Sequence, residues 1–209
     1  MNFLRRHWFD TGIGLAGITG IFLLLKGGDL SQLQLILWLS LISLFIHQVG
    51  EYRWPGYFPG MVNAVLYKSD MPDRYPLNSQ TSLVINAGIG WGCYFLAAVL
   101  AERGIWLGIA CILVSCGNIV AHVFLFNIKG KTFYNPGMAT ALLLFLPIAV
   151  FFFYNVIAGS IAGPADWIAG ILLGIALNVI GIVKLIGWMA DRRTKFVFAP
   201  RLMGPYRKM

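Results

Sequence analysis

Six long apolar segments occupy most of this 209-residue chain and limit what it can fold into. At a rise of about 1.5 Å per residue, a helix of about 18–25 residues crosses ~30 Å of hydrocarbon. The segments lack the alternation typical of membrane β-strands. The sequence therefore predicts an all-α, polytopic membrane bundle of six transmembrane helices, at residues 8–25, 33–50, 81–101, 105–126, 137–157 (with a kink at Pro147) and 166–190.

Composition excludes a water-soluble globule. Hydrophobic residues make up 58% of the chain and charged residues 11%, against about 25% charged residues in ordinary soluble proteins. The net charge of +8 does not indicate a nucleic-acid partner, because the basic residues gather at the ends of the apolar segments. The three cysteines lie inside apolar segments, so we interpret them as reduced packing residues: Cys93, Cys111 and Cys116.

The basic residues also predict the orientation. With the N-terminus inside the cell, thirteen lysines and arginines fall in inner segments and two, Lys26 and Arg103, in outer loops. By the positive-inside rule both termini are cytoplasmic. We expect one domain over residues 1–190 in a bacterial inner membrane, with a long cytoplasmic loop at 51–80. Residues 191–209 form a basic cytoplasmic tail that contacts anionic lipid.

The inner loop at 51–80 is rich in aromatic residues, proline and glycine. This composition favours an ordered loop at the lipid headgroups, with a short interfacial helix at 61–67.

Glycines in the last segment, Gly170 and Gly174, form a GxxxG pattern that allows two helices to approach closely. The pattern indicates tight packing inside the bundle or, as the alternative, an oligomer through glycine-rich faces.

Polar residues inside the segments are few, and most share one depth. His47 and Glu51 are four residues apart, as are Asn118 and His122, so each pair shares a helix face. Both histidines lie about five residues, or roughly 7 Å, from the cytoplasmic end of their segment. Asn86 and Lys184 fall at a similar level on two other segments. Because hydrocarbon penalises polar groups, a shared layer indicates a site below the inner leaflet surface.

Three interpretations of this layer stay open. His47, Glu51 and His122 have the side chains to ligate one divalent transition metal, zinc or iron. The same three residues suit metal-free proton transfer. In the third interpretation the histidines only bond neighbouring carbonyl groups, and Glu51 pairs with a basic residue. Asn86 and Asn118 complete the set of candidate catalytic residues.

Candidate substrate-binding residues lie on the same side of the membrane. They are Asp70 and Asp73 in the long loop, Lys184 near the end of the last segment, and Tyr134 and Asn135 before the fifth segment. The stretch 134–137 also has a structural interpretation, with Asn135 as a helix N-cap and proline at the first helical position. A capped N-terminus there would attract an anionic head group.

The stretch from His47 to Glu51 resembles the His-x-x-Glu-Glu motif of the HXXEE family of small bacterial membrane proteins. His47 and Glu51 match the motif, whereas Gly50 stands at its first glutamate. The pairing of Asn118 with His122 and the stretch 134–137 look like downstream features of that family, and the resemblance covers residues 33–146. It implies a histidine–carboxylate site in a helical membrane fold. If the missing glutamate were a ligand or base, a family activity would be lost here.

Three functions are compatible with these features. The first is an intramembrane enzyme on a lipid-like or otherwise hydrophobic small molecule. It would be a hydrolase or oxidoreductase with a metal, or an isomerase without one. The second is a small-molecule transporter, which predicts polar groups at the midplane and internal repeats. The third is a membrane anchor or assembly subunit for a soluble partner, which leaves the embedded histidines unexplained.

Overall fold

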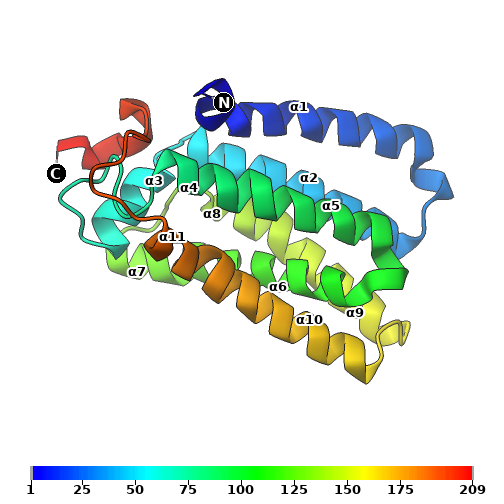
Figure 1. Ribbon diagram of the computed structural model, residues 1–209. Coiled ribbons are helices and arrows are strands. Elements are labelled where there is room, and N and C mark those ends of the chain that lie inside the picture. The colour runs from blue at the N-terminus through cyan, green and yellow to red at the C-terminus, as the bar shows by residue number, and fades with distance from the viewer. Residues whose placement is uncertain (1, 209) are drawn as a thin grey trace.

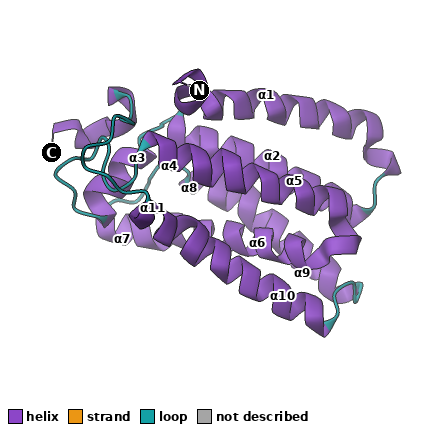
Figure 2. Ribbon diagram, viewed as in Figure 1, coloured by secondary structure: helices purple, strands orange, loops and turns teal. Residues whose placement is uncertain are grey.

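The computed structural model describes residues 2–208; Met1 and Met209, at the ends of the predicted domain and tail, lie outside the described residues. No strand occurs between residues 2 and 208, and the loops gather mainly at one end of the molecule (Figure 2). Within this range five helical runs are long and apolar enough to cross a membrane: Phe3–Asp29, Gln32–Tyr52, Ser79–Gly130, Met138–Ala158 and Pro164–Trp188. The predicted all-helical fold is confirmed, and its helices are those of a membrane protein.

The third run differs from the predicted pattern because it is one helical stretch of 52 residues. A straight helix of that length would extend ~78 Å, more than twice the hydrocarbon thickness. The chain instead turns in η4, a short 3-10 segment at Ala101–Gly104, where Ala101 has a φ of +44°. Helices α5 and α6 on either side of η4 pack together (Figure 1). The run therefore contains both segments that the sequence separated, 81–101 and 105–126.

The helical elements have the following bounds. The first two runs consist of α1 (Asn2–Lys26), η1 (Gly27–Asp29) and α2 (Gln32–Tyr52). They are followed by α3 (Phe58–Met61) and η2 (Val62–Leu66) in the loop at 51–80. The long hairpin consists of α4 (Ser79–Leu83), η3 (Val84–Gly90), α5 (Trp91–Leu100), η4, α6 (Ile105–Val120), η5 (Ala121–Leu125) and α7 (Phe126–Gly130). The last part holds α8 (Met138–Thr140), η6 (Ala141–Phe145), α9 (Leu146–Ala158), α10 (Pro164–Ala176), η7 (Leu177–Lys184), α11 (Leu185–Trp188) and η8 (Pro200–Lys208).

Local capping fixes where several helices begin. Ser31 accepts a hydrogen bond from the Gln34 backbone, and the Gln34 side chain accepts one from the Ser31 backbone, which starts α2 with a capping box. The Asn78 side chain accepts hydrogen bonds from the backbone N–H groups of Gln80 and Thr81 and so caps the start of α4. Pro164 occupies the first turn of α10, where its missing N–H costs nothing.

Helix α2 lies at the centre of the bundle. Of an 18-residue window in α2, 56% is buried, against 11% in the run from α10 to α11. Helix α1 packs on α2, α9 packs on α2 and α6, and α10 packs on α6. Both ends of the described chain lie at one end of the bundle, with α3, α7 and α11, and the turns at η1, η4 and 159–163 lie at the other (Figure 1). The C-terminal part of α2 lies at the same end of the bundle as the two chain ends, and other elements enclose it on several sides.

Five segments of the described chain are wound as π-helix, with wider turns than an α-helix: η2, η3, η5, η6 and η7. Such turns are frequent at functional sites because they redirect side chains. Pro147, where we predicted a kink, lies in the first turn of α9 directly after η6.

The loop at 51–80 and the C-terminal segment fold together. The predicted helix at 61–67 is present as α3 and η2, and Met61, Val62 and Asn63 are buried. The Phe198 backbone donates to the Asp73 carbonyl, and Gly60 lies directly against Met203. The segment 191–208 therefore covers the end of the bundle at which it emerges.

The GxxxG glycines pack within this chain. A Cβ atom at Gly170 would lie 2.7 Å from Ile109 Cβ, and one at Gly174 would lie 2.9 Å from Leu113 Cβ. These glycines therefore allow the close approach of α10 to α6, as the first of our two interpretations predicted.

Candidate functional site

His47, Glu51 and His122 meet inside the bundle. His47 and Glu51 are one turn apart on α2, and His122 comes from η5. Glu51 Oε1 lies 3.3 Å from His122 Nε2 and 3.6 Å from His47 Nε2. One ligand atom from each residue lies within 4.8 Å of the others. The predicted meeting of these three side chains is confirmed, and we call them the His–Glu–His cluster.

The cluster is enclosed by protein. His47, Glu51 and His122 are 2%, 4% and 0% exposed. The His122 ring is flanked by Phe58 and Phe126, with centroids 5.3 and 5.1 Å away. Since an isolated buried charge is very unfavourable, the carboxyl group requires a proton or a positive partner.

The ring nitrogen of His47 that faces away from Glu51, Nδ1, is held by Thr140 of α8. This atom lies 3.0 Å from Thr140 Oγ1, and the Thr140 hydroxyl donates to the Gly137 carbonyl oxygen at 2.9 Å. Because the single hydroxyl proton is used there, the Thr140 oxygen accepts from His47. The hydrogen bond therefore places a ring proton of His47 on Nδ1, and in the neutral ring Nε2 carries a lone pair.

His122 is held in the same way by Asn135. The Asn135 amide nitrogen donates to the His122 carbonyl at 2.7 Å and to Asn127 Oδ1 at 2.8 Å. Both partners are acceptors, which fixes the orientation of the carboxamide and leaves its oxygen 2.6 Å from His122 Nδ1. His122 therefore donates from Nδ1, and in the neutral ring its Nε2 also carries a lone pair.

The role of Asn135 corrects one prediction. We expected Asn135 to cap a helix that begins with proline, but α8 begins at Met138 with Gly137 as its N-cap. Gly137 has a φ of +95°, and a Cβ atom there would lie 2.6 Å from His122 Cε1. The stretch 134–137 therefore packs against His122, and Asn135 orients its ring. Only a glycine fits at position 137, because any side chain there would collide with that ring.

The two inner nitrogens are left without hydrogen bonds. Neither His47 Nε2 nor His122 Nε2 has a hydrogen-bond partner among the described residues, although both atoms are buried. Both point at the same carboxylate oxygen. Two lone pairs and a carboxylate oxygen repel one another unless a proton or a cation lies between them. This arrangement can bind a metal ion or share a proton.

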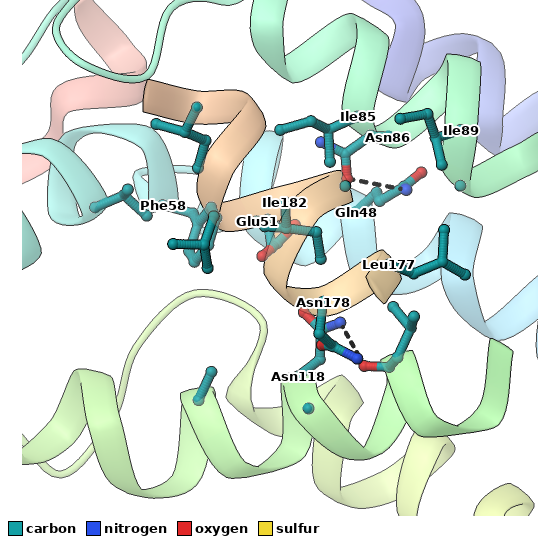
Figure 3. A pocket seen from close by; sticks show the side chains of 18 of the residues that line it. Gln48, Glu51, Phe58, Ile85, Asn86, Ile89, Asn118, Leu177, Asn178 and Ile182 are labelled. Carbon is teal, nitrogen blue, oxygen red and sulfur yellow. Dashed lines mark hydrogen bonds between the residues drawn. The ribbon is translucent and has the colours of Figure 1, made fainter. Parts of the chain in front are cut away.

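A cavity of about 360 Å³ adjoins the cluster, and His47 and Glu51 form part of its wall (Figure 3). Its apolar lining includes Phe58, Ile85, Ile89, Leu177 and Ile182. Four carboxamide side chains interrupt this lining: Gln48, Asn86, Asn118 and Asn178. The cavity lies between η3, α6 and η7, and Figure 3 places Glu51 beside it.

The remaining predicted site residues divide into two groups. Asn86 and Asn118 line the cavity, and Asn86 accepts a hydrogen bond from Gln48 at 3.2 Å. Four residues do not line it: Asp70, Asp73, Tyr134 and Lys184.

Both loop aspartates form ion pairs with arginines. Asp70 accepts a hydrogen bond from Arg192, which lowers the pKa of the exposed Asp70 carboxyl. Asp73 pairs with Arg74 at 2.7 Å. These carboxylates are thus occupied in stabilising the loop.

Several site residues were missed by reasoning from the sequence. Gln48 adjoins His47 in the chain and is 1% exposed, and its position beside a candidate ligand was an available signal. Thr140, by contrast, is an ordinary residue in an apolar segment and gave no signal. Its role depends on the packing of α8 against α2.

Comparison with known protein families matches residues 38–152 to a family described as "Protein of unknown function with HXXEE motif". The match covers more than half of the chain and includes the whole cluster with Asn135 and Thr140. No curated protein and no solved structure matches the chain. The chain therefore belongs to the HXXEE family, as the residues from His47 to Glu51 predicted.

Proposed function

We propose that this protein is an intramembrane enzyme in which His47, Glu51 and His122 bind one divalent transition metal, zinc or iron. The observation that carries the proposal is the pair of buried Nε2 atoms, both without a hydrogen bond and both facing Glu51. Two imidazoles and one carboxylate are a ligand set known for zinc hydrolases and for non-haem iron oxygenases.

The surroundings of the cluster fit a metal site. Metal-binding histidines almost always donate their second ring N–H to an acceptor that fixes the tautomer. Here Thr140 and Asn135 are those acceptors. When bound, such a metal supplies an activated water or an oxygen-binding position. Glu51 would provide the negative charge that balances part of the metal's charge.

The cavity supports a hydrophobic substrate. Its walls are mainly apolar, and its volume lies in the range of about 300–1,000 Å³ that is typical of small-molecule sites. Three lining residues, Leu125, Val179 and Val183, are also exposed on the outside of the bundle. A lipid-like molecule would therefore enter sideways from the membrane.

We further propose six membrane crossings with both termini in the cytoplasm of a bacterium, in its inner membrane. The turn at η4 and the two chain ends at one end of the bundle support an even number of crossings. The excess of basic residues at that end supports its cytoplasmic placement. On this view the site lies in the inner leaflet, and the basic tail contacts anionic lipid headgroups.

A transporter is the second candidate. The observation that favours it is the set of π-helical turns, η3, η5 and η7, which interrupt three helices around the cavity. Interrupted helices around a polar cavity are also a feature of transporters. The role of a membrane anchor has no comparable support, because it requires no buried histidines.

Metal analysis of the protein in lipid nanodiscs, with and without added zinc or iron(II), tests the main proposal. We expect about one equivalent in the wild type and loss of binding in His47→Ala and His122→Ala. The control His7→Ala should keep the metal, because His7 pairs with Asp10 away from the cluster. A folded wild type that binds neither metal would refute the metal site and leave proton transfer by the same residues as the alternative.

A further inference from the structure

The cavity beside the cluster has an unusual charge pattern for a site at the lipid headgroups. Its lining among the described residues contains no lysine and no arginine, and Glu51 is its only carboxyl group. Phosphate groups are generally bound by arginine, lysine or helix N-termini. A phosphate head would therefore meet no lysine or arginine in this cavity, and the only cation near it would be the metal proposed at the cluster, whose charge Glu51 partly balances.

Apart from the cluster, one cysteine and three tyrosines, the polar side chains that line the cavity are carboxamides. Gln48 and Asn86 are occupied with each other, and Gln48 also accepts from Trp91 at 2.7 Å. Asn118 and Asn178 use their amide nitrogens on backbone carbonyls of their own or the neighbouring helix. Their carboxamide oxygens accept no hydrogen bond from the described residues. The cavity thus offers two free acceptors.

These acceptors are close to the cluster. Asn118 precedes His122 by four residues in the helical run from α6 to η5, about one turn or ~6 Å along the axis. Asn178 packs against Gly117, where any side chain would overlap its carboxamide oxygen. Figure 3 shows Asn118 and Asn178 together on one side of the cavity. A head group bound to them would lie beside His122 and Glu51.

We propose that the ligand of this cavity is an uncharged amphiphile whose head donates hydrogen bonds to Asn118 and Asn178, such as a long-chain alcohol or amide. The inference rests on the proposed function, because it names the substrate class of that site. It excludes phospholipids and other anionic lipids as substrates, although they surround the protein.

Photo-crosslinking in nanodiscs tests this inference. Three probes carry the same diazirine-bearing alkyl chain and differ only in the head, which is a hydroxyl, a phosphate or a trimethylammonium group. We expect the hydroxyl probe to label cavity peptides at least about tenfold more than either charged probe. Asn118→Leu and Asn178→Leu should each reduce that labelling about three- to tenfold, the usual effect of one lost hydrogen bond.

Asn155→Leu is the matched control. Asn155 also donates to the carbonyl four residues earlier, but it lies outside the cavity on α9. Equal labelling by the phosphate probe would overturn the inference, as would equal labelling of the Asn118→Leu and Asn155→Leu variants. The comparison of the three probes on the wild type needs no variant to fold.

Labelling of metal-free protein separates the two proposals. Hydroxyl selectivity that depends on Asn118, in a wild type that binds neither zinc nor iron(II) when they are added, would refute the metal site and support this inference. A protein that binds the metal but labels equally with all three probes would support the metal site and refute this inference.

Discussion

At the scale of single residues, the properties of the cluster depend on the groups behind the two imidazole rings. Thr140 and Asn135 each accept a hydrogen bond from a ring Nδ1–H and so turn Nε2 toward Glu51. A histidine without such a partner could present either nitrogen in either protonation state. The orientation of both imidazole rings is therefore set by two residues that do not themselves face Glu51.

Asn135 is the clearest test of this dependence. Asn135→Leu removes the acceptor of His122 Nδ1 and the donor to the His122 carbonyl, so we expect metal affinity to fall by about 10–100-fold. Competition with a chelator measures this change. Tyr134→Phe is the control, because Tyr134 is the exposed neighbour of Asn135 and lies outside the cavity. An unchanged affinity in Asn135→Leu would show that Asn135 does not position His122.

Two glycines that face each other should respond oppositely to alanine. At Gly137 the positive φ costs about 1–2 kcal/mol in any other residue, and the added Cβ would collide with the His122 ring. At Gly50 the nearest atoms, in Gly137 and Thr140, lie at an ordinary 3.6 Å. Gly50→Ala should therefore stabilise α2 by about 0.5–1 kcal/mol, as helix propensity predicts.

Thermal unfolding of both variants measures the difference. We expect a lower Tm and weaker metal binding in Gly137→Ala, and an equal or higher Tm with unchanged binding in Gly50→Ala. A loss of metal in Gly50→Ala would mean that Gly50 is needed at the site for more than its lack of a side chain.

At the scale of elements, the packing of α10 on α6 depends on Gly170. A Cβ atom there would lie 2.7 Å from Ile109 Cβ and 2.8 Å from the Trp106 carbonyl oxygen. Gly170→Ala should destabilise the protein by about 1–3 kcal/mol, as overpacking generally does. Gly20→Ala is the control, because nothing lies within 4 Å of that position. Equal unfolding temperatures for the two variants would contradict tight packing at this interface.

How much the sequence could predict differs between elements. The meeting of His47, Glu51 and His122 was predictable, because depth in a membrane follows directly from position in an apolar segment. The π-helical turns could not be predicted. A segment that is apolar on all sides has no periodicity in its sequence that distinguishes a π-helix from an α-helix. The partner of His122 was not predictable either, because Asn135 before Pro136 equally suits a helix cap.

At the scale of the whole molecule, the C-terminal segment shows a similar limit. Its basic residues predicted a tail that contacts the membrane surface, and this stays a prediction. Its apolar residues are few and scattered, yet Phe198, Leu202 and Met203 are buried against the loop at 51–80. Such packing depends on the shape of the loop, which neither composition nor periodicity records.

The topology of the whole chain can be tested with single cysteines. Six crossings place Gly28 and Arg103 outside, and Lys68 and Arg207 inside. In a background without Cys93, Cys111 and Cys116, a membrane-impermeant maleimide should label Gly28→Cys and Arg103→Cys in spheroplasts with an intact inner membrane. Lys68→Cys and Arg207→Cys should react only after permeabilisation.

Five crossings would give a different pattern, because a single crossing by the run Ser79–Gly130 would move the C-terminus to the outside. Arg207→Cys would then be labelled in intact spheroplasts, while Lys68→Cys would stay protected. That result would also move η5, α8 and the C-terminal segment to the outer side. His122 would then lie at the opposite side of the membrane from the C-terminal end of α2, which carries Glu51. This would conflict with the 3.3 Å contact between His122 and Glu51. The labelling of Arg207→Cys therefore tests the topology and, through it, the His–Glu–His cluster.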